Sequence, residues 1–386
     1  MGGTFMLHGF IFATWISRIP TLRGALGLTN GQLGALMLAL SAGALIVLPF
    51  TGLVVGRFGA NKTVVRTSMM FAVGLATVAF SANYSVVPVV VGLFVLGVGH
   101  ATWDVAMNCQ ATTLEGQLKR PLIPRLHAGF SIGAVVGAGF GSLMLRFDIP
   151  FLVHVLIVAA VLLGLTPLIT RNFPTDTAAV ASSESSAGGA LSAWREPRTL
   201  IIGAFIAMFS FCEGTGNDWL AVASIDGHGV SESNGSLMFA AFTAAMTIGR
   251  FVGPVAIERL GRQWSAVLCS VSAILGVLSV ALTSSTAFVI AGAVFWGIGA
   301  SLGIPLGISA AGDDPQRAAG RVSAVLTISY VSFLSGPPLI GFLADHTGVL
   351  NAIILAAGAA AVGLLLSPIL RTTRASEEEP QPTSAK

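Results

Sequence analysis

The chain has 386 residues, of which 54% are hydrophobic and only 10% are charged, and its formal net charge is +3. Soluble domains carry about a quarter of charged residues, so this composition excludes a soluble protein and indicates an integral membrane protein. The small net charge predicts no nucleic-acid partner. The three cysteines, Cys109, Cys212 and Cys269, lack metal-ligand spacing and lie in or beside apolar runs.

Apolar runs of about 20 residues, each long enough to cross a hydrocarbon core, recur along the whole chain. They must be helices, because a backbone in lipid has to satisfy its own hydrogen bonds. The first run starts almost at the N-terminus, so we expect no removable signal peptide. The sequence predicts twelve spans, at 3–19, 32–54, 64–82, 87–110, 127–145, 150–169, 199–222, 235–257, 264–283, 286–308, 322–343 and 349–369.

The basic residues are distributed unevenly among the segments that connect these spans. With a cytoplasmic N-terminus, sixteen of the 20 Lys and Arg residues lie in cytoplasmic segments, three in outer segments and one, Arg250, in a span. Cytoplasmic loops of membrane proteins are enriched in Lys and Arg, so we expect both termini in the cytoplasm. The sixteen are Arg57, Lys62, Arg66, Lys119, Arg120, Arg125, Arg171, Arg195, Arg198, Arg259, Arg262, Arg317, Arg321, Arg371, Arg374 and Lys386.

A polar segment rich in small residues, 170–198, divides the spans six and six. Its composition is typical of a flexible linker. The sequence therefore predicts an all-α membrane protein with two six-helix halves, 1–169 and 199–370. The tail 371–386, with three consecutive glutamates and two prolines, is predicted to be disordered and cytoplasmic.

Short segments of the two halves match at a nearly constant spacing of 200–202 residues. The matching pairs are 94–99 with 294–299, Gly141 with Gly341, 56–59 with 258–261 and, more loosely, His8-Gly9 with Glu213-Gly214. In membrane proteins built from parallel repeats, polar ligands bind near the midplane at the interface between the repeats. The pattern predicts a site between the halves.

The strongest candidate for such a site is Asp104, an acid inside a long apolar run. His100, Asp104 and Asn108 are spaced i, i+4, i+8 and therefore share one helical face. An ionisable group at hydrocarbon depth is costly, so it usually faces a cavity or a partner. We interpret Asp104 as a proton-carrying or ligand-coordinating acid; the alternative is a structural hydrogen bond to a neighbouring helix.

Three further charged residues lie in predicted spans of the second half. Glu213 is flanked by Gly214 and Gly216, which could open backbone carbonyls to a ligand. Asp218 is nearer the outer surface, where it is either a gate residue or a solvated span end. Arg250 needs an anion, which is either a neighbouring carboxylate or the ligand itself.

Histidines and aromatic residues complete the candidate site. His8 and His100 titrate near neutral pH and could relay protons, although a satisfied polar contact is the alternative for each. Trp15 and Trp219 could stack on a ligand, or simply pack between helices. Asn108 could hydrogen-bond a polar ligand or join two helices.

These features resemble the major facilitator superfamily along the whole chain. The segment from Gly52 to Lys62 fits the family's loop pattern at Arg57, Gly59 and Lys62, whereas Gly56 stands where an acid is usual. The second half fills that acid position with Glu258, followed by Arg259. The resemblance implies a cytoplasmic gate formed by these residues.

More narrowly, the chain resembles the branch that holds fucose–proton symporters and rhizopine-associated, MosC-like bacterial permeases. The resemblance rests on residues 8–10, 18–20, 28–32 and 97–108. It implies proton coupling through Asp104. Those symporters also have an acid on the first span, and residues 15–17 have none, so neither fucose nor the full proton route is carried over.

We therefore expect a secondary transporter of a small polar solute, sugar- or inositol-like, coupled to protons. It is expected to be a monomer in the bacterial inner membrane, without cofactor or metal. The alternatives are a proton-driven exporter of amphiphilic compounds and a non-transporting membrane sensor. No motif of a hydrolase, a zinc enzyme or a nucleotide-binding protein is present, so we expect no enzyme.

Overall fold

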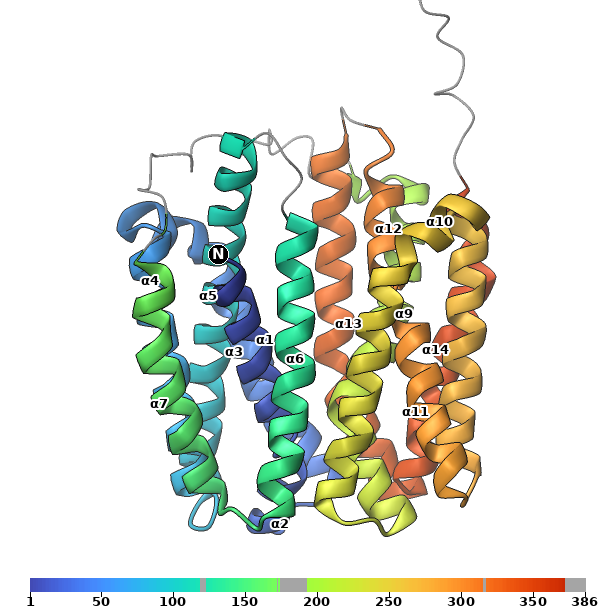
Figure 1. Ribbon diagram of the computed structural model, residues 1–386. Coiled ribbons are helices and arrows are strands. Elements are labelled where there is room, and N and C mark those ends of the chain that lie inside the picture. Colours follow the sequence, from blue (N-terminus) through green and yellow to red (C-terminus); the bar gives the residue numbers. More distant parts are fainter. Residues whose placement is uncertain (119–122, 172, 174–192, 315–316, 372–386) are drawn as a thin grey trace, which may run out of the picture.

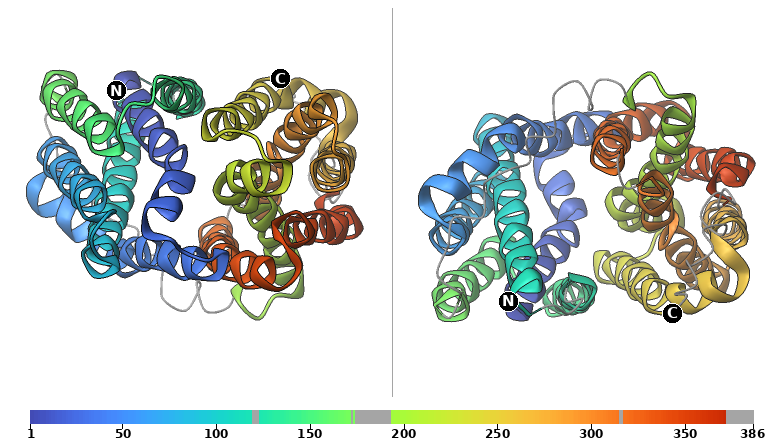
Figure 2. Two further views of the ribbon diagram at one scale, coloured as in Figure 1. Left: turned by 90° about the horizontal axis from the view of Figure 1, so that it is seen from below. Right: turned by 90° about the horizontal axis from the view of Figure 1, so that it is seen from above.

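The computed structural model describes residues 1–118, 123–171, 173, 193–314 and 317–371, and within them all regular secondary structure is helical. Two helical bundles stand side by side, the first coloured blue to green and the second yellow to red in Figures 1 and 2. The first holds α1 (Gly2–Ile16), α2 (Ile19–Leu26), α3 (Asn30–Phe58), α4 (Ala60–Ser81), α5 (Val86–Leu118), α6 (Ile123–Arg146) and α7 (Phe151–Thr170). The second holds α9 (Pro197–His228), α10 (Glu232–Leu282), α11 (Thr286–Ala300), α12 (Gly303–Ala311), α13 (Ala318–Thr347), α14 (Val349–Leu366) and the 3-10 helix η1 (Ser367–Leu370).

Ten helical segments within the described residues are long and apolar enough to cross a membrane. The twelve predicted runs all coincide with helices, but two of them are interrupted and two are joined. α10 has 51 residues because it continues through Gly261, whose φ of 78° and ψ of 165° are not helical. Only glycine adopts that conformation without strain, so α10 consists of two helices that meet at a kink.

Prolines account for the two interruptions. In the first predicted span, 3–19, α1 ends at Ile16, and a second helix, α2, begins at Ile19 and continues beyond the predicted end to Leu26; the tenth stops at Ala300 and resumes as α12. Pro20 and Pro305 lie just beyond these points, and proline has no N–H to bond the carbonyl four residues earlier. The carbonyls of Ile16 and Ser301 thus lose their helical donors.

Glycines let the helices of each half approach closely at equivalent places. A Cβ on Gly97 of α5 would lie 1.9 Å from the Leu40 carbonyl oxygen of α3. On Gly297 of α11 it would lie 2.2 Å from the Phe242 carbonyl oxygen of α10. Segments 94–99 and 294–299 therefore hold the same helix crossing in both halves, which explains the repetition of this pair.

Gly141 and Gly341 share the same offset but make different contacts. A Cβ on Gly141 would meet the Ser17 hydroxyl of its own half at 1.9 Å, whereas one on Gly341 would meet the Asn30 carbonyl oxygen of the other half at 2.4 Å. This sequence match does not reflect an equivalent contact.

The two halves are joined at the end of the molecule that carries α2, opposite the N-terminus (Figure 1). We call it the α2 end. The contacts there lie between α3 and α13 and between α6 and α10. Within the described residues, the hydrogen bonds that cross between the halves are Thr21 to Glu232, Arg23 to Asp226, Thr29 and Gly31 to Asp345, and Ser142 with Ser233.

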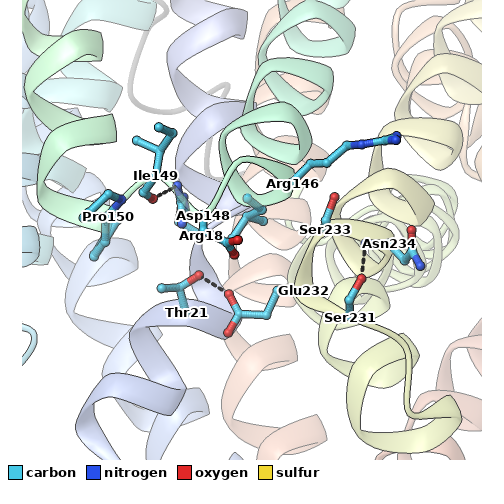
Figure 3. Close-up of a pocket in the computed structure, with 12 residues that line it drawn as sticks. Arg18, Thr21, Arg146, Asp148, Ile149, Pro150, Ser231, Glu232, Ser233 and Asn234 are labelled. Atoms are coloured by element: carbon cyan, nitrogen blue, oxygen red, sulfur yellow. Dashed lines mark hydrogen bonds between the residues drawn. The ribbon is translucent and has the colours of Figure 1, made fainter.

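A cavity of about 610 Å³ opens beside these contacts (Figure 3). The Thr21 hydroxyl and Glu232 both line this cavity, and the hydroxyl donates a hydrogen bond to the Glu232 carboxylate at 2.5 Å. Arg18 is only 3% exposed and donates to the Ile149 carbonyl at 2.9 Å and to His154 Nδ1 at 2.7 Å. The α2 end is thus closed by polar contacts that cross from one half to the other.

Candidate functional site

Asp104 lies half-buried on the unbroken helix α5. Asn108, one turn further on, donates from Nδ2 to the Asp104 carboxylate at 3.3 Å and to its backbone carbonyl at 2.9 Å. His127 Nε2 on α6 lies 3.2 Å from Asn108 Oδ1. The acid therefore heads a short chain of side chains from α5 to α6, as the shared face of Asp104 and Asn108 predicts.

His100, one turn before Asp104, lies in a stack of rings. The His8 and His100 rings stack at 4.4 Å between centroids, with Trp103 at 5.2 Å from His8 and Phe12 at 4.9 Å from His100. Both ring nitrogens of His8 and Nδ1 of His100 are buried, with no hydrogen-bond partner among the described residues. Burial without partners favours neutral rings, and the relay role remains a prediction.

The second half contributes an ion pair. Arg250 Nη2 on α10 lies 3.0 Å from Glu213 Oε1 on α9, and Arg250 Nε donates to the Ser301 carbonyl at 3.4 Å. That carbonyl is the one that Pro305 leaves without a helical donor. Glu213 Oε2 is buried and has no hydrogen-bond partner among the residues that the structure describes. Arg250 thus has a carboxylate partner, as predicted for a cation within a span, and Glu213 keeps one oxygen for another donor.

Two electrostatic interactions link polar residues across the interface between the halves. The charge of Arg250 acts electrostatically on His127, and the charge of Asp104 acts on Tyr330 of α13. Residues of α5 and α6 therefore lie within electrostatic range of residues of α13 and α10, and together they form one candidate site. We call it the midplane site, and its members are Asp104, Asn108, His127, Glu213, Arg250 and Tyr330.

Three other predicted residues lie elsewhere. Trp15 is 2% exposed and lines a small cavity with Leu75 of α4 and His154 of α7, inside its own half. Trp219 is 1% exposed, and Asp218 is half-buried on α9. These surroundings are those of packing residues for the two tryptophans, and ligand binding by the three remains a prediction.

The predicted gate residues are exposed at the end opposite α2, except that Gly59 is half-buried. They are Arg57, Gly59, Lys62, Glu258 and Arg259. Gly59 and Gly261 have φ of 79° and 78°, so both halves turn there in a conformation that requires glycine. The Arg57 guanidinium lies over the Phe58 ring at 5.7 Å.

A different ionic cluster occupies that end of the second half. Arg262 pairs with Asp313 at 2.7 Å, and Arg321 pairs with Glu196 at 2.6 Å. The hydrogen bond from Arg321 holds the pKa of Glu196 below its usual value. These residues join helices of one half, and a latch between the halves through Glu258 and Arg259 remains a prediction.

His127 and Tyr330 were not identified from the sequence. Neither lies in a repeated segment, and Tyr330 is on a predicted span without any charged residue near it. His127 carried one usable signal, because it opens a predicted span and a histidine at that border can reach the polar face of a neighbouring helix.

Comparison with known proteins agrees with this arrangement. A family model described as Major Facilitator Superfamily matches residues 1–330 and, again, 210–386. An uncharacterized transporter, y4wD, of Sinorhizobium fredii is 30% identical over 369 residues, 95% of this chain and 96% of its own. The membrane protein MosC of Rhizobium meliloti is 26% identical, with 97% and 90% covered.

Two solved structures are similar over nearly the whole chain. The nucleoside transporter NupG has a TM-score of 0.77 at 14% identity, with 96% of this chain and 97% of its own covered. The E. coli fucose:proton symporter FucP in its outward conformation has a TM-score of 0.66 at 18% identity, with 96% and 99% covered. The expected resemblance to the MosC and fucose symporter branch is confirmed.

Proposed function

Because the chain belongs to the major facilitator superfamily, we propose that it moves a small polar solute across the bacterial inner membrane by alternating access, coupled to protons. The chain is a multi-pass membrane transporter and not an enzyme. The proposed solute is sugar- or inositol-like. FucP, which carries fucose, and NupG, which carries nucleosides, both handle polyhydroxylated compounds and support this class.

The proposed topology has twelve spans and both termini in the cytoplasm. α10 counts as two spans at Gly261, α1 with α2 forms the first, α11 with α12 the tenth, and α14 with η1 the twelfth. The unequal distribution of basic residues then makes the α2 end the outer end. Since the halves are joined at the α2 end, the proposed state is closed to the outside and faces the cytoplasm. We propose a monomer, with 170–198 as the linker.

One observation carries the coupling proposal: polar groups of the two halves lie within electrostatic range of each other, Asp104 of α5 with Tyr330 of α13 and His127 of α6 with Arg250 of α10. An acid that exchanges its proton with each side in turn has to lie where the halves separate. A carboxylate inside one bundle would not sense that motion. Asp104 on α5 and Tyr330 on α13 satisfy this requirement.

The test is uptake into proteoliposomes under an imposed pH gradient. Hexoses, inositols, nucleosides, amines and small acids would first be screened by thermal shift, since a ligand that binds only the native state raises its apparent stability. We expect gradient-driven accumulation of one of these classes by the native protein and only equilibration by Asp104→Asn.

Asp148→Asn is the matched control, because Asp148 is an exposed loop acid with a φ of 52° that asparagine also tolerates. It should accumulate solute like the native protein. Full accumulation by Asp104→Asn would end the coupling proposal. Sidedness in vesicles separates uptake from export, and binding without movement of any solute would indicate the sensor.

A further inference from the structure

His127 is a polar residue of the midplane site to which neither the repeat nor the family pattern points. It lies near the start of α6, exposed, with the Phe5 ring of α1 edge-on at 5.2 Å. Its Nε2 contacts Asn108 Oδ1 at 3.2 Å. An amide oxygen only accepts hydrogen bonds, so His127 is the donor in this contact.

That contact holds the direction of the Asn108 amide, together with the 2.9 Å bond that Nδ2 donates to the Asp104 backbone carbonyl. With its oxygen held by His127, the amide presents its NH₂ group to Asp104, at 3.3 Å from the carboxylate. If the amide turned over, its oxygen would face the carboxylate oxygens and repel them. A hydrogen bond donated to a carboxylate favours the ionised form.

We propose that His127 is a positioning residue: by holding the amide of Asn108 it sets the pH at which Asp104 releases its proton. The inference rests on the proposed proton coupling through Asp104. His127 sits on α6, one of the helices that contact the other half, and Asp104 sits on α5.

Other charged and titratable groups also face these two side chains. They are His100 on α5, Arg250 on α10 with its partner Glu213 on α9, and Tyr330 on α13. The experiment must therefore separate an effect through Asn108 from a direct effect of a charge near Asp104.

The experiment is an infrared titration of the purified protein, which needs no substrate. The band of protonated Asp104 is identified by its loss in Asp104→Asn. In His127→Ala, we expect the pH at which this band is half-maximal to rise by about one unit, because the ionised acid loses an oriented donor. His127→Gln should restore the native value, since its side-chain amide can donate to the same oxygen.

Asn108→Ala supplies the second test. It should raise the midpoint as His127→Ala does, and adding His127→Ala to it should change nothing more. His346→Ala, at an exposed histidine of α13, should leave the midpoint unchanged. An unchanged midpoint in His127→Ala, or a shift that persists in the Asn108→Ala background, would overturn the positioning role.

The two proposals fail separately. If Asp104→Asn abolishes accumulation while His127→Ala leaves the midpoint unchanged, only the positioning role is lost. If Asp104→Asn accumulates solute normally, the coupling proposal is lost whatever His127 does.

Discussion

The two halves share their helix crossings but divide the polar groups between them. Gly97 and Gly297 bring the same pair of helices together. By contrast, the residue 200 positions after Asp104 is Ile304, and the residue 202 positions before Arg250 is Leu48. The first half thus presents an acid that shares hydrogen bonds with neutral groups, and the second presents an ion pair. The halves therefore share their packing, whereas each of these charged residues occurs in one half only.

The helix interruptions differ between the halves in the same way. The first half interrupts its first span at Pro20, and its fourth, α5, runs unbroken past Asp104. The second half keeps α9 unbroken and interrupts its tenth span at Pro305. There the freed carbonyl of Ser301 accepts a hydrogen bond from the half-buried Arg250. The two copies therefore differ in backbone as well as charge at the midplane site.

The largest expected effects come from the shared glycines. Gly97→Ala and Gly297→Ala each place a Cβ in steric clash with a backbone carbonyl oxygen of the neighbouring helix. The clash can be relieved only if one of the two helices moves. Each should lower the free energy of unfolding by about 3 kcal/mol, the upper part of the range for overpacking. Chemical unfolding in detergent measures it.

Gly52→Ala on α3 and Gly358→Ala on α14 are the controls, because nothing lies within 4 Å of a Cβ at either position. They should be neutral or slightly stabilising, since alanine favours helix over glycine by about 1 kcal/mol. If Gly97→Ala and Gly297→Ala differed strongly from one another, the halves would not share this crossing.

Much of the fold could be predicted because its signals are local. Apolar runs give the helices, and close-packing glycines such as Gly97 and Gly297 recur at one offset. Gly341 shows the limit: its offset from Gly141 is correct, but it packs against the other half. Sequence spacing identifies which residues share a helical face, and it does not identify the helix that this face contacts.

The site was predictable only in part, for the same reason. Asp104, Glu213 and Arg250 stand out because charge at hydrocarbon depth is rare. His127 and Tyr330 join them through the approach of α6 and α13, which no pattern along α5 encodes. Trp15 had the right residue type, but its helix turns it toward α4 and α7.

An intermediate effect on the free energy of unfolding is expected when Arg250 of the second half is replaced by the residue at the corresponding position of the first half. Arg250→Leu, which copies Leu48, leaves Glu213 without its partner. Loss of one partner from a fully buried pair costs about 3–5 kcal/mol. The Arg250 side chain is 32% exposed, so solvent screening lowers the expected loss to about 1–2 kcal/mol.

Adding Glu213→Gln to Arg250→Leu should recover about half of that loss, because no unpaired acid remains. A double-mutant cycle on unfolding free energies measures the coupling. Additive effects would show that the pair contributes nothing to stability, and the contrast between the halves would then concern function alone.

The smallest effect is expected at two of the contacts that close the α2 end, which occupy corresponding places in the two halves. In one, Asp345 of α13 accepts from Thr29 Oγ1 at 2.8 Å and from the Gly31 N–H at 3.0 Å, at the N-terminus of α3. In the other, Ser142 of α6 and Ser233 exchange hydroxyl-to-carbonyl bonds of 2.9 and 3.1 Å at the N-terminus of α10. A carboxylate at a helix N-terminus is the stronger of the two, because it meets the positive end of the helix dipole.

Asp345→Asn should therefore open the α2 end more often than Ser142→Ala. We expect Asp345→Asn to remove about 1 kcal/mol of stabilisation of the closed state and to raise the ratio of open to closed molecules about fivefold. For Ser142→Ala we expect about 0.5 kcal/mol and about a twofold rise. Spin labels at Tyr84 and Ser284, exposed loop positions of opposite halves, report the distance in a background without the native cysteines. If Ser142→Ala opened this end more than Asp345→Asn, the serine pair would be the stronger closure. The charge of Asp345 would then not be what holds the two halves together.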